Sequence, residues 1–248
     1  MKETPKKTKV FFIHGLESGP EGGKVQMMRE DGFEVQSVDM KMSAYRLDKK
    51  NSVLRNVFRT QGFMYWVLAT LTFIVISYFR DLSWKVVVVL FLGGQVVVYF
   101  FVKNLIAQAW QKSIESCLDL QLKPLKDFEP DIIVGSSYGG AISMELIRRG
   151  LWKGPTILLA PAYNAILGRV RIAEHDDHIQ KIRDLSREQS IVIFHDPSDD
   201  VVPHEDSVTQ AKDSQIEFIS IDAEGHRMLG ILKNGVLFEK IRSMTCGE

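Results

Sequence analysis

Cysteine is scarce in this chain. Its two cysteines, Cys117 and Cys246, lie far apart in the sequence and share no metal-binding or redox spacing. A reducing compartment is therefore the simplest context for the protein.

An excess of charge of one sign is also missing. The chain of 248 residues carries 31 basic and 31 acidic side chains, so its formal net charge is zero. No global electric field attracts nucleic acid, and we expect no nucleic-acid partner. Internal repeats and low-complexity tracts are absent from the sequence. With 45% hydrophobic residues, a chain of this length can bury a full core as one domain of ordinary size.

A secretory signal peptide is not expected at the start of the chain. The segment MKETPKKTKVFFIHG is basic and then apolar, but its apolar part has only about five residues, fewer than the roughly 7–15 of a signal-peptide core. The apolar part is typical of a strand instead.

Short β-branched runs alternate with helical stretches along most of the chain. Strands are predicted at KVFFIH, FEVQSVD, DIIVGS, TILLAPA, SIVIFHD and IEFISID, and helices at about 23–30, 113–128, 139–150 and 230–244. This alternation is typical of a parallel sheet covered by helices on both faces. The sequence therefore predicts a doubly wound, mostly parallel α/β sheet of about six strands.

A G-x-S-x-G motif, Gly135–Gly139, follows the predicted strand DIIVGS and opens a predicted helix. This is the context of a nucleophile elbow, a sharp turn whose flanking positions need glycine. The motif indicates Ser137 as the nucleophile, and Ser136 is expected to point away. A serine needs a base and an oriented acid. Asp199 and Asp200 follow one later predicted strand, and His226 follows the next, so the predicted catalytic triad consists of Ser137, His226 and one of these two aspartates.

Acyl transfer also needs donors for a developing oxyanion. The backbone N–H of Tyr138, directly after the nucleophile at the start of its helix, is one candidate. The second is the backbone N–H of Leu16, in the loop after the first strand, where Gly15 allows a close approach of the backbone. Residues His14 and Gly15 could equally serve only to turn the chain.

Other polar residues are weaker candidates for a functional site. The segment 174–178, EHDDH, contains metal-capable side chains, but a polar helix start explains it better, and no metal or cofactor is implied. His204 is a weaker candidate for the base than His226. Tyr163 and Asn164 are placed by position alone as candidates for the acyl pocket.

Five segments resemble, in sequence and order, the small bacterial esterase-type α/β-hydrolases: FFIHGLESGPEGGK, VGSSYGGA, LLAPA, DPSDDVVPHEDS and GHRML. The resemblance covers roughly residues 8–40 and 110–245 and implies an α/β-hydrolase fold. It also implies that the acid is the first aspartate of the D-x-V-V-P-like segment, here Asp199. Relatives often have glycine where this chain has Asp196, so Asp196 remains a second candidate for orienting His226.

Two long apolar runs interrupt this pattern. About 20 uncharged residues separate Arg59 from Arg80, and about 17 separate Lys85 from Lys103, lengths that approach a bilayer span of about 20 residues. We expect residues 57–103 to form an inserted hydrophobic hairpin that anchors the protein by contact of residues 60–103 with membrane lipid. Residues 1–56 and 104–248 then form the catalytic domain. The basic residues that precede the first run favour the cytoplasmic side for this domain.

The resulting hypothesis is a membrane-anchored serine hydrolase that cleaves small carboxylic esters or thioesters, including lipid-like ones. Two alternatives stay open. The first is a soluble, cytoplasmic esterase whose hairpin is a lid or a dimer interface. The second is a non-catalytic lipid-binding membrane protein on the same fold.

Overall fold

The computed structural model describes residues 7–59, 66–67, 69–71, 78, 84–170 and 175–245. Six strands in this part of the chain form one sheet in the order β2-β1-β5-β6-β7-β8, and every neighbouring pair is parallel. The six are β1 (Lys9–Ile13), β2 (Glu34–Ser37), β5 (Ile132–Ser136), β6 (Thr156–Leu159), β7 (Ile191–His195) and β8 (Glu217–Ser220). The predicted parallel sheet of about six strands is confirmed.

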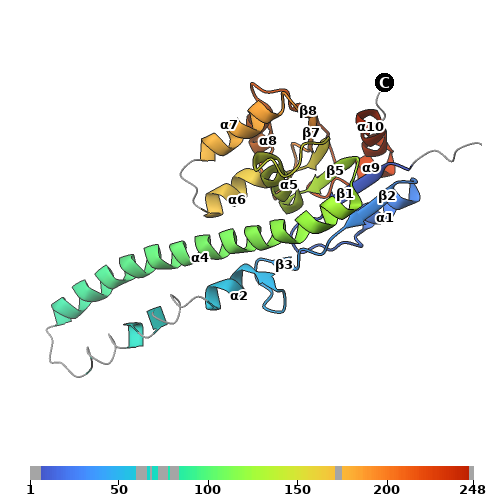
Figure 1. The fold of residues 1–248 in the computed structure, drawn as a ribbon. Coiled ribbons are helices and arrows are strands. Elements are labelled where there is room, and N and C mark those ends of the chain that lie inside the picture. The colour runs from blue at the N-terminus through green and yellow to red at the C-terminus, as the bar shows by residue number, and fades with distance from the viewer. Residues whose placement is uncertain are drawn as a thin grey trace, which may run out of the picture.

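Helices cover both faces of the sheet, because alternate strand residues enter two separate cores. Phe11 and Ile13 join the core beneath α4 (Trp84–Phe128), α5 (Tyr138–Arg148), α6 (Tyr163–Val170) and α7 (His175–Leu185). Val10 and Phe12 join the core beneath α1 (Gly23–Glu30), α9 (Gly230–Lys233) and α10 (Val236–Thr245). Helix α8 (His204–Ala211) contacts β7 and β8. The arrangement is doubly wound, as Figure 1 shows.

A small substructure follows β2 that the sequence did not predict. Strands β3 (Met42–Ser43) and β4 (Asn51–Ser52) pair in parallel and lead into α2 (Val53–Phe58). The buried side chain of Asn51 donates to the Met40 carbonyl at 2.7 Å and accepts from Ser116 of α4 at 2.8 Å. These bonds tie the segment after β2 to α4.

Helix α4 corrects the expected organisation of the apolar segment. The second apolar run is not a separate helix, because it continues without a break into the helix predicted at 113–128 and forms one helix of 45 residues. From Ala109 onward this helix contributes side chains, including Trp110 and Leu118, to the core of the α/β domain. Figure 1 shows α4 passing α5 and α6 and extending beyond them.

The expected membrane anchor was wrong. In the ranges that the structure describes, no helix combines the length and the apolar character needed to cross a bilayer. The prediction had counted the second run as an independent span, whereas its helix belongs in part to the α/β core. The placement of the catalytic domain on the cytoplasmic side of a membrane depended on that span and falls with it. The lipid contact of residues 60–103 is not confirmed. Most of the first run, 62–79, lies outside the described residues.

The helix predicted at 230–244 is divided in two. Helix α9 ends at Lys233 and α10 begins at Val236, with Gly235 between them at a φ of +80°. A residue in this left-handed region interrupts a right-handed helix, and glycine adopts it without steric cost.

Candidate active site

Ser137 occupies a strained turn between β5 and α5. Its φ of 54° and ψ of −116° lie in a region that non-glycine residues seldom adopt. The neighbouring glycines make the turn possible: a Cβ on Gly139 would lie 2.0 Å from the Ile13 carbonyl oxygen, and a Cβ on Gly135 would lie 2.3 Å from Ser143 Oγ. The turn therefore projects the Ser137 side chain at the carboxyl end of a central strand.

The imidazole of His226 lies between Ser137 and Asp199. Its Nε2 is 2.9 Å from Ser137 Oγ, and its Nδ1 is 2.8 Å from Asp199 Oδ2. The carboxylate can only accept, so Nδ1 carries the hydrogen and Nε2 is left to accept from the serine hydroxyl. The three side chains come from the ends of β5, β7 and β8, as expected for an open parallel sheet.

Asp199 is held as a carboxylate by several donors. Its Oδ1 accepts from the backbone N–H groups of Val201 at 2.8 Å and Val202 at 2.9 Å. Burial alone would raise the pKa of Asp199, but the hydrogen bonds from Val202, His226 and Val201 outweigh it and lower the pKa. The group facing His226 is therefore negatively charged at neutral pH.

A second histidine supports Asp199, and the sequence analysis missed it. His195, fully buried at the end of β7, places its Nε2 at 3.1 Å from Asp199 Oδ2 and its Nδ1 at 2.7 Å from Ser207 Oγ. Burial lowers the pKa of His195, so the ring is neutral, with Nε2 donating and Nδ1 accepting from the Ser207 hydroxyl. The signal that could have identified it is its position four residues before the acid at a strand end.

Asp196 bonds the backbone of the loop that precedes His226 rather than the His226 imidazole. Its Oδ1 accepts from the N–H and hydroxyl of Ser198 at 2.7 and 2.8 Å, and its Oδ2 accepts from the N–H groups of Glu224 and Gly225. Burial would raise its pKa, but these four hydrogen bonds lower the pKa of Asp196 to about 2. Asp200 is exposed. Of the three candidate acids, Asp199 is the one in contact with His226.

A cavity of about 470 Å³ opens beside Ser137 and His226. The loop between β1 and α1 forms one wall of it, including Leu16, while Tyr138 begins α5 with its ring buried against Trp110. The first N–H groups of a helix lack acceptors within the helix, so the Tyr138 N–H is a suitable donor. Ser136, expected to point away, also lines the cavity, and its Oγ accepts from Lys24 Nζ at 2.8 Å.

His14 fastens the cavity wall. Its Nδ1 lies 2.8 Å from the Gly15 carbonyl, and its Nε2 accepts from the Met40 N–H at 3.2 Å. Burial lowers the pKa of His14, which matches a neutral ring donating at one nitrogen and accepting at the other. His14 therefore connects the loop after β1 to the segment after β2.

The remaining candidates lie elsewhere. Tyr163 is fully buried and donates to Glu145 at 2.6 Å, while Asn164 accepts from Gln210 at 3.0 Å, so both belong to the helical layer. His204 begins α8 and packs its ring against Phe218. Residues 175–178 begin α7, Glu174 lies outside the described residues, and among the described residues no three potential metal ligands gather in one place.

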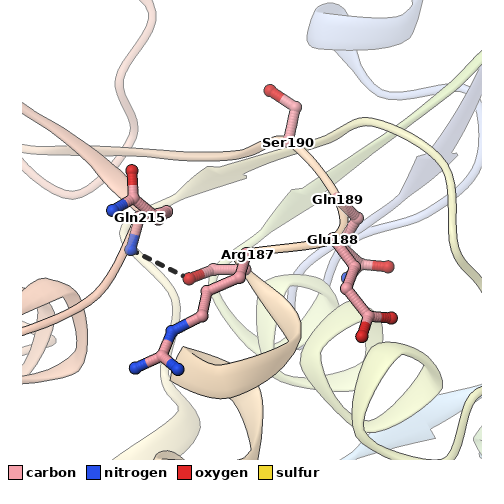
Figure 2. A pocket seen from close by; sticks show the side chains of 6 residues that line it. Arg187, Glu188, Gln189, Ser190 and Gln215 are labelled. Atoms are coloured by element: carbon pink, nitrogen blue, oxygen red, sulfur yellow. Dashed lines mark hydrogen bonds between the residues drawn. The ribbon is translucent and has the colours of Figure 1, made fainter.

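A second pocket, of about 540 Å³, lies at the opposite edge of the sheet. Its lining residues precede β7 and β8 at their amino ends: Ser186, Arg187, Glu188, Gln189, Ser190 and Gln215. Figure 2 shows the side chains that line this pocket. The Gln215 N–H donates to Ser186 Oγ at 3.0 Å. None of the three triad residues lies there, so the cavity beside Ser137 is the better candidate site.

The chain was compared with known proteins. No protein-family model and no curated protein matches it. Among solved structures, TT1662 from Thermus thermophilus aligns over 98% of this chain and 90% of its own, with a TM-score of 0.56 at 11% identity. The metagenome-derived lipolytic enzymes LipS and LipT give 0.52 at 12% identity, over 96% of this chain and 94% of theirs. Est1E from Butyrivibrio proteoclasticus gives 0.50 at 17% identity, over 98% and 88%.

These likenesses concern the fold. The parallel order of the six strands, the helices on both faces and the aligned structures together show the α/β-hydrolase fold that the sequence motifs implied.

Proposed function

We propose that the protein is a serine hydrolase that cleaves carboxylic esters or thioesters. The observation that carries this proposal is the continuous hydrogen-bond chain from Ser137 through His226 to Asp199, beside a cavity large enough for a small substrate. A non-catalytic protein has no need for a strained serine aligned with an oriented imidazole.

In the first half of the reaction, Ser137 Oγ attacks the carbonyl carbon of the substrate. His226 Nε2 takes the hydroxyl proton and then gives it to the departing oxygen or sulfur, which leaves as an alcohol or thiol. Asp199 stabilises the imidazolium that forms between these two steps. The acyl group remains bound to Ser137 as an ester.

In the second half, water attacks the acyl-enzyme carbonyl. His226 Nε2 removes a proton from the water and returns it to Ser137 Oγ, so the carboxylic acid leaves and the enzyme is regenerated. We assign the backbone N–H groups of Leu16 and Tyr138 to the oxyanion in both halves. The position of Leu16 in the cavity wall and of Tyr138 at the start of α5 supports this assignment.

The α/β-hydrolase fold supports the proposal, since it carries this chemistry in many proteins, and LipS and LipT are described as lipolytic. Of the sequence-based hypotheses, the esterase without a membrane anchor fits better than the anchored one. The expectation of a lipid-like substrate rested on the anchor, so the proposal covers small esters and thioesters only.

The test is replacement of Ser137 by alanine. We expect the wild-type protein to hydrolyse short p-nitrophenyl esters and a fluorophosphonate probe to label it at Ser137. Ser137→Ala should lower kcat by at least about 10³-fold and abolish labelling, because no other group supplies the nucleophile.

Ser243→Ala is the matched control, since Ser243 is exposed on α10 and its hydroxyl donates to the Lys240 carbonyl. Circular dichroism should show both variants folded. Unchanged turnover in folded Ser137→Ala protein would contradict the proposal, and absence of turnover in the wild type would favour the non-catalytic alternative.

A further inference from the structure

The cavity beside Ser137 contains a lysine that the reaction described above does not use. Lys24, in the first turn of α1, is half-buried and lines the cavity with Ser136, Ser137 and His226. Its ammonium donates to Ser136 Oγ at 2.8 Å, next along the chain from the serine that carries the chemistry. A neutral hydroxyl satisfies one of its three N–H donors but does not balance its charge.

A second cation lines the same cavity. Arg227 follows His226 directly in the chain, is exposed, and forms no ion pair within the ranges that the structure describes. The positive charge of Arg227 disfavours a second positive charge nearby and so contributes to the lowered pKa of Lys24. The two cations therefore share one space although they repel each other.

The acidic side chains of this region are engaged elsewhere. Glu17 is the one carboxylate among the lining residues, and its Oε1 accepts from Ser43 Oγ and from the Ala44 N–H at 3.0 Å. Glu21, near the start of α1, pairs with Arg29. The two groups that bond Glu17 are neutral and do not cancel its charge, so the lining residues include two cations and one carboxylate. Within the described ranges Glu17 forms no ion pair with Lys24 or Arg227, so neither cation has a paired counter-charge.

We infer that the substrate of this site is an ester or thioester bearing a carboxylate or phosphate, and that Lys24 and Arg227 bind this anionic group. This inference rests on the proposed function and specifies its substrate class. An anion in the cavity supplies the missing counter-charge and accepts charge-assisted hydrogen bonds from both side chains. It is held beside the reacting carbonyl, because Lys24 is bonded to the neighbour of Ser137.

The protonation of Lys24 supports this arrangement. Burial is the main cause that lowers the pKa of Lys24, to about 8, and Arg227 adds to the effect. The ammonium is therefore charged at neutral pH but close to losing its proton. A bound anion reverses the electrostatic balance and favours the charged form.

The experiment compares esters that differ in charge alone. On the acyl side the pair is p-nitrophenyl hexanoate and mono-p-nitrophenyl adipate. On the leaving-group side, 4-acetoxybenzamide is compared with 4-acetoxybenzoate and with 4-acetoxyphenyl phosphate. We expect kcat/KM for at least one charged ester to exceed that of its neutral partner by about tenfold, the size of effect that charge-assisted hydrogen bonds supply. The pair that shows this difference in kcat/KM tells whether the anionic group lies on the acyl side or the leaving-group side, and whether it is a carboxylate or a phosphate.

The variants Lys24→Met and Arg227→Gln should reduce the charged-to-neutral ratio toward one, mainly through KM. Lys112→Met is the matched control, because Lys112 is exposed on α4 away from the cavity, and its ratio should equal that of the wild type.

Turnover of all esters without charge preference overturns the inference alone. So does an equal loss for charged and neutral esters in Lys24→Met, since that result assigns Lys24 a structural role. Absence of turnover of every ester by folded wild-type protein contradicts the proposed function, and the inference falls with it.

Discussion

Asp199 accepts hydrogen bonds from two imidazoles and two backbone N–H groups, so almost all of its acceptor capacity is used. His195 is itself held by Ser207. His195 shares Oδ2 with His226, and the two N–H groups hold Oδ1, so the position of the carboxylate has little freedom. The orientation of the proposed base is therefore set by residues that never touch a substrate.

Replacing Asp199 by asparagine should disrupt the tautomer of His226 while preserving its packing. An amide nitrogen facing Nδ1 favours a hydrogen on Nε2, where it blocks proton transfer from Ser137. We expect kcat to fall by about 10³–10⁴-fold. Steady-state hydrolysis of a p-nitrophenyl ester across pH measures the loss.

Asp200→Asn is the control for this prediction, because Asp200 is the adjacent exposed aspartate. Its kcat should stay within about twofold of the wild type, as for most surface substitutions. An equal loss in both variants would show that the loop, rather than the carboxylate of Asp199, is responsible.

At this scale the sequence predicted the groups that follow strands and missed those that depend on packing. The proximity of Ser137, Asp199 and His226 could be predicted because each lies in the turn or loop that follows a strand of a parallel sheet, and such strand ends meet at one edge. Lys24 reaches the cavity from a helix whose orientation no motif encodes. Sequence spacing could not tell whether Asp196 or Asp199 contacts His226. The local turns determine that Asp199 bonds His226 and that Asp196 bonds the Glu224 N–H.

At the scale of elements, the β5–α5 turn requires α5 to lie very close to β1. Gly139→Ala introduces a Cβ that would lie 2.0 Å from the Ile13 carbonyl oxygen, so the helix must shift away from the strand. We expect a loss of about 1–3 kcal/mol in the free energy of unfolding, together with a loss of activity as Ser137 moves. Urea unfolding followed by circular dichroism measures the first effect.

Gly168→Ala is the matched substitution in a helix with open space. Among the described residues, no atom outside its own turn of helix lies within 4 Å of its added Cβ, so the variant should be neutral or more stable by up to about 1 kcal/mol. Equal destabilisation in the two variants would argue against steric contact as the cause.

The helices and strands were predicted well where the apolar pattern is strong. They were predicted poorly where tertiary contacts determine whether an element forms and where it ends. The six strands and α1 were found from β-branched runs and loop glycines. Helix α4 was divided by the sequence analysis because its apolar run resembles an independent span, and only its packing in the core shows that it continues. Strands β3 and β4 consist of two residues each and carry no periodic signal.

For the whole molecule, Asp196 connects the loops after β7 and β8, and this connection should depend on pH. Its folded-state pKa of about 2 lies below the ordinary value, so its contribution to stability is present above the unfolded-state pKa near 4. The contribution is lost as pH falls from about 4 toward 2. Asp196→Asn should therefore lower the urea midpoint at pH 6 more than at pH 3.

Glu145 also contributes to the loss of stability at acidic pH in this measurement. Burial would raise its pKa, but hydrogen bonds from Arg148 and Tyr163 lower it to about 2, so the wild type should lose further stability at acidic pH. The informative quantity is thus the difference between the wild type and Asp196→Asn at each pH. A difference that does not shrink at pH 3 would refute the assigned role of Asp196.

Hydrogen bonds of Asp196 and Asp199 connect the loop after β7 to the loop that carries His226. The two loops therefore position the proton-transfer groups as one unit. The opposite wall comes from residues 15–24, near the other end of the chain. The proton-transfer groups and the wall that contains Lys24 are thereby encoded in separate stretches of the gene, whereas Arg227 lies next to His226. A library confined to codons 17–24 should change which substrates are accepted while leaving Ser137, His226, Asp199 and Leu16 intact.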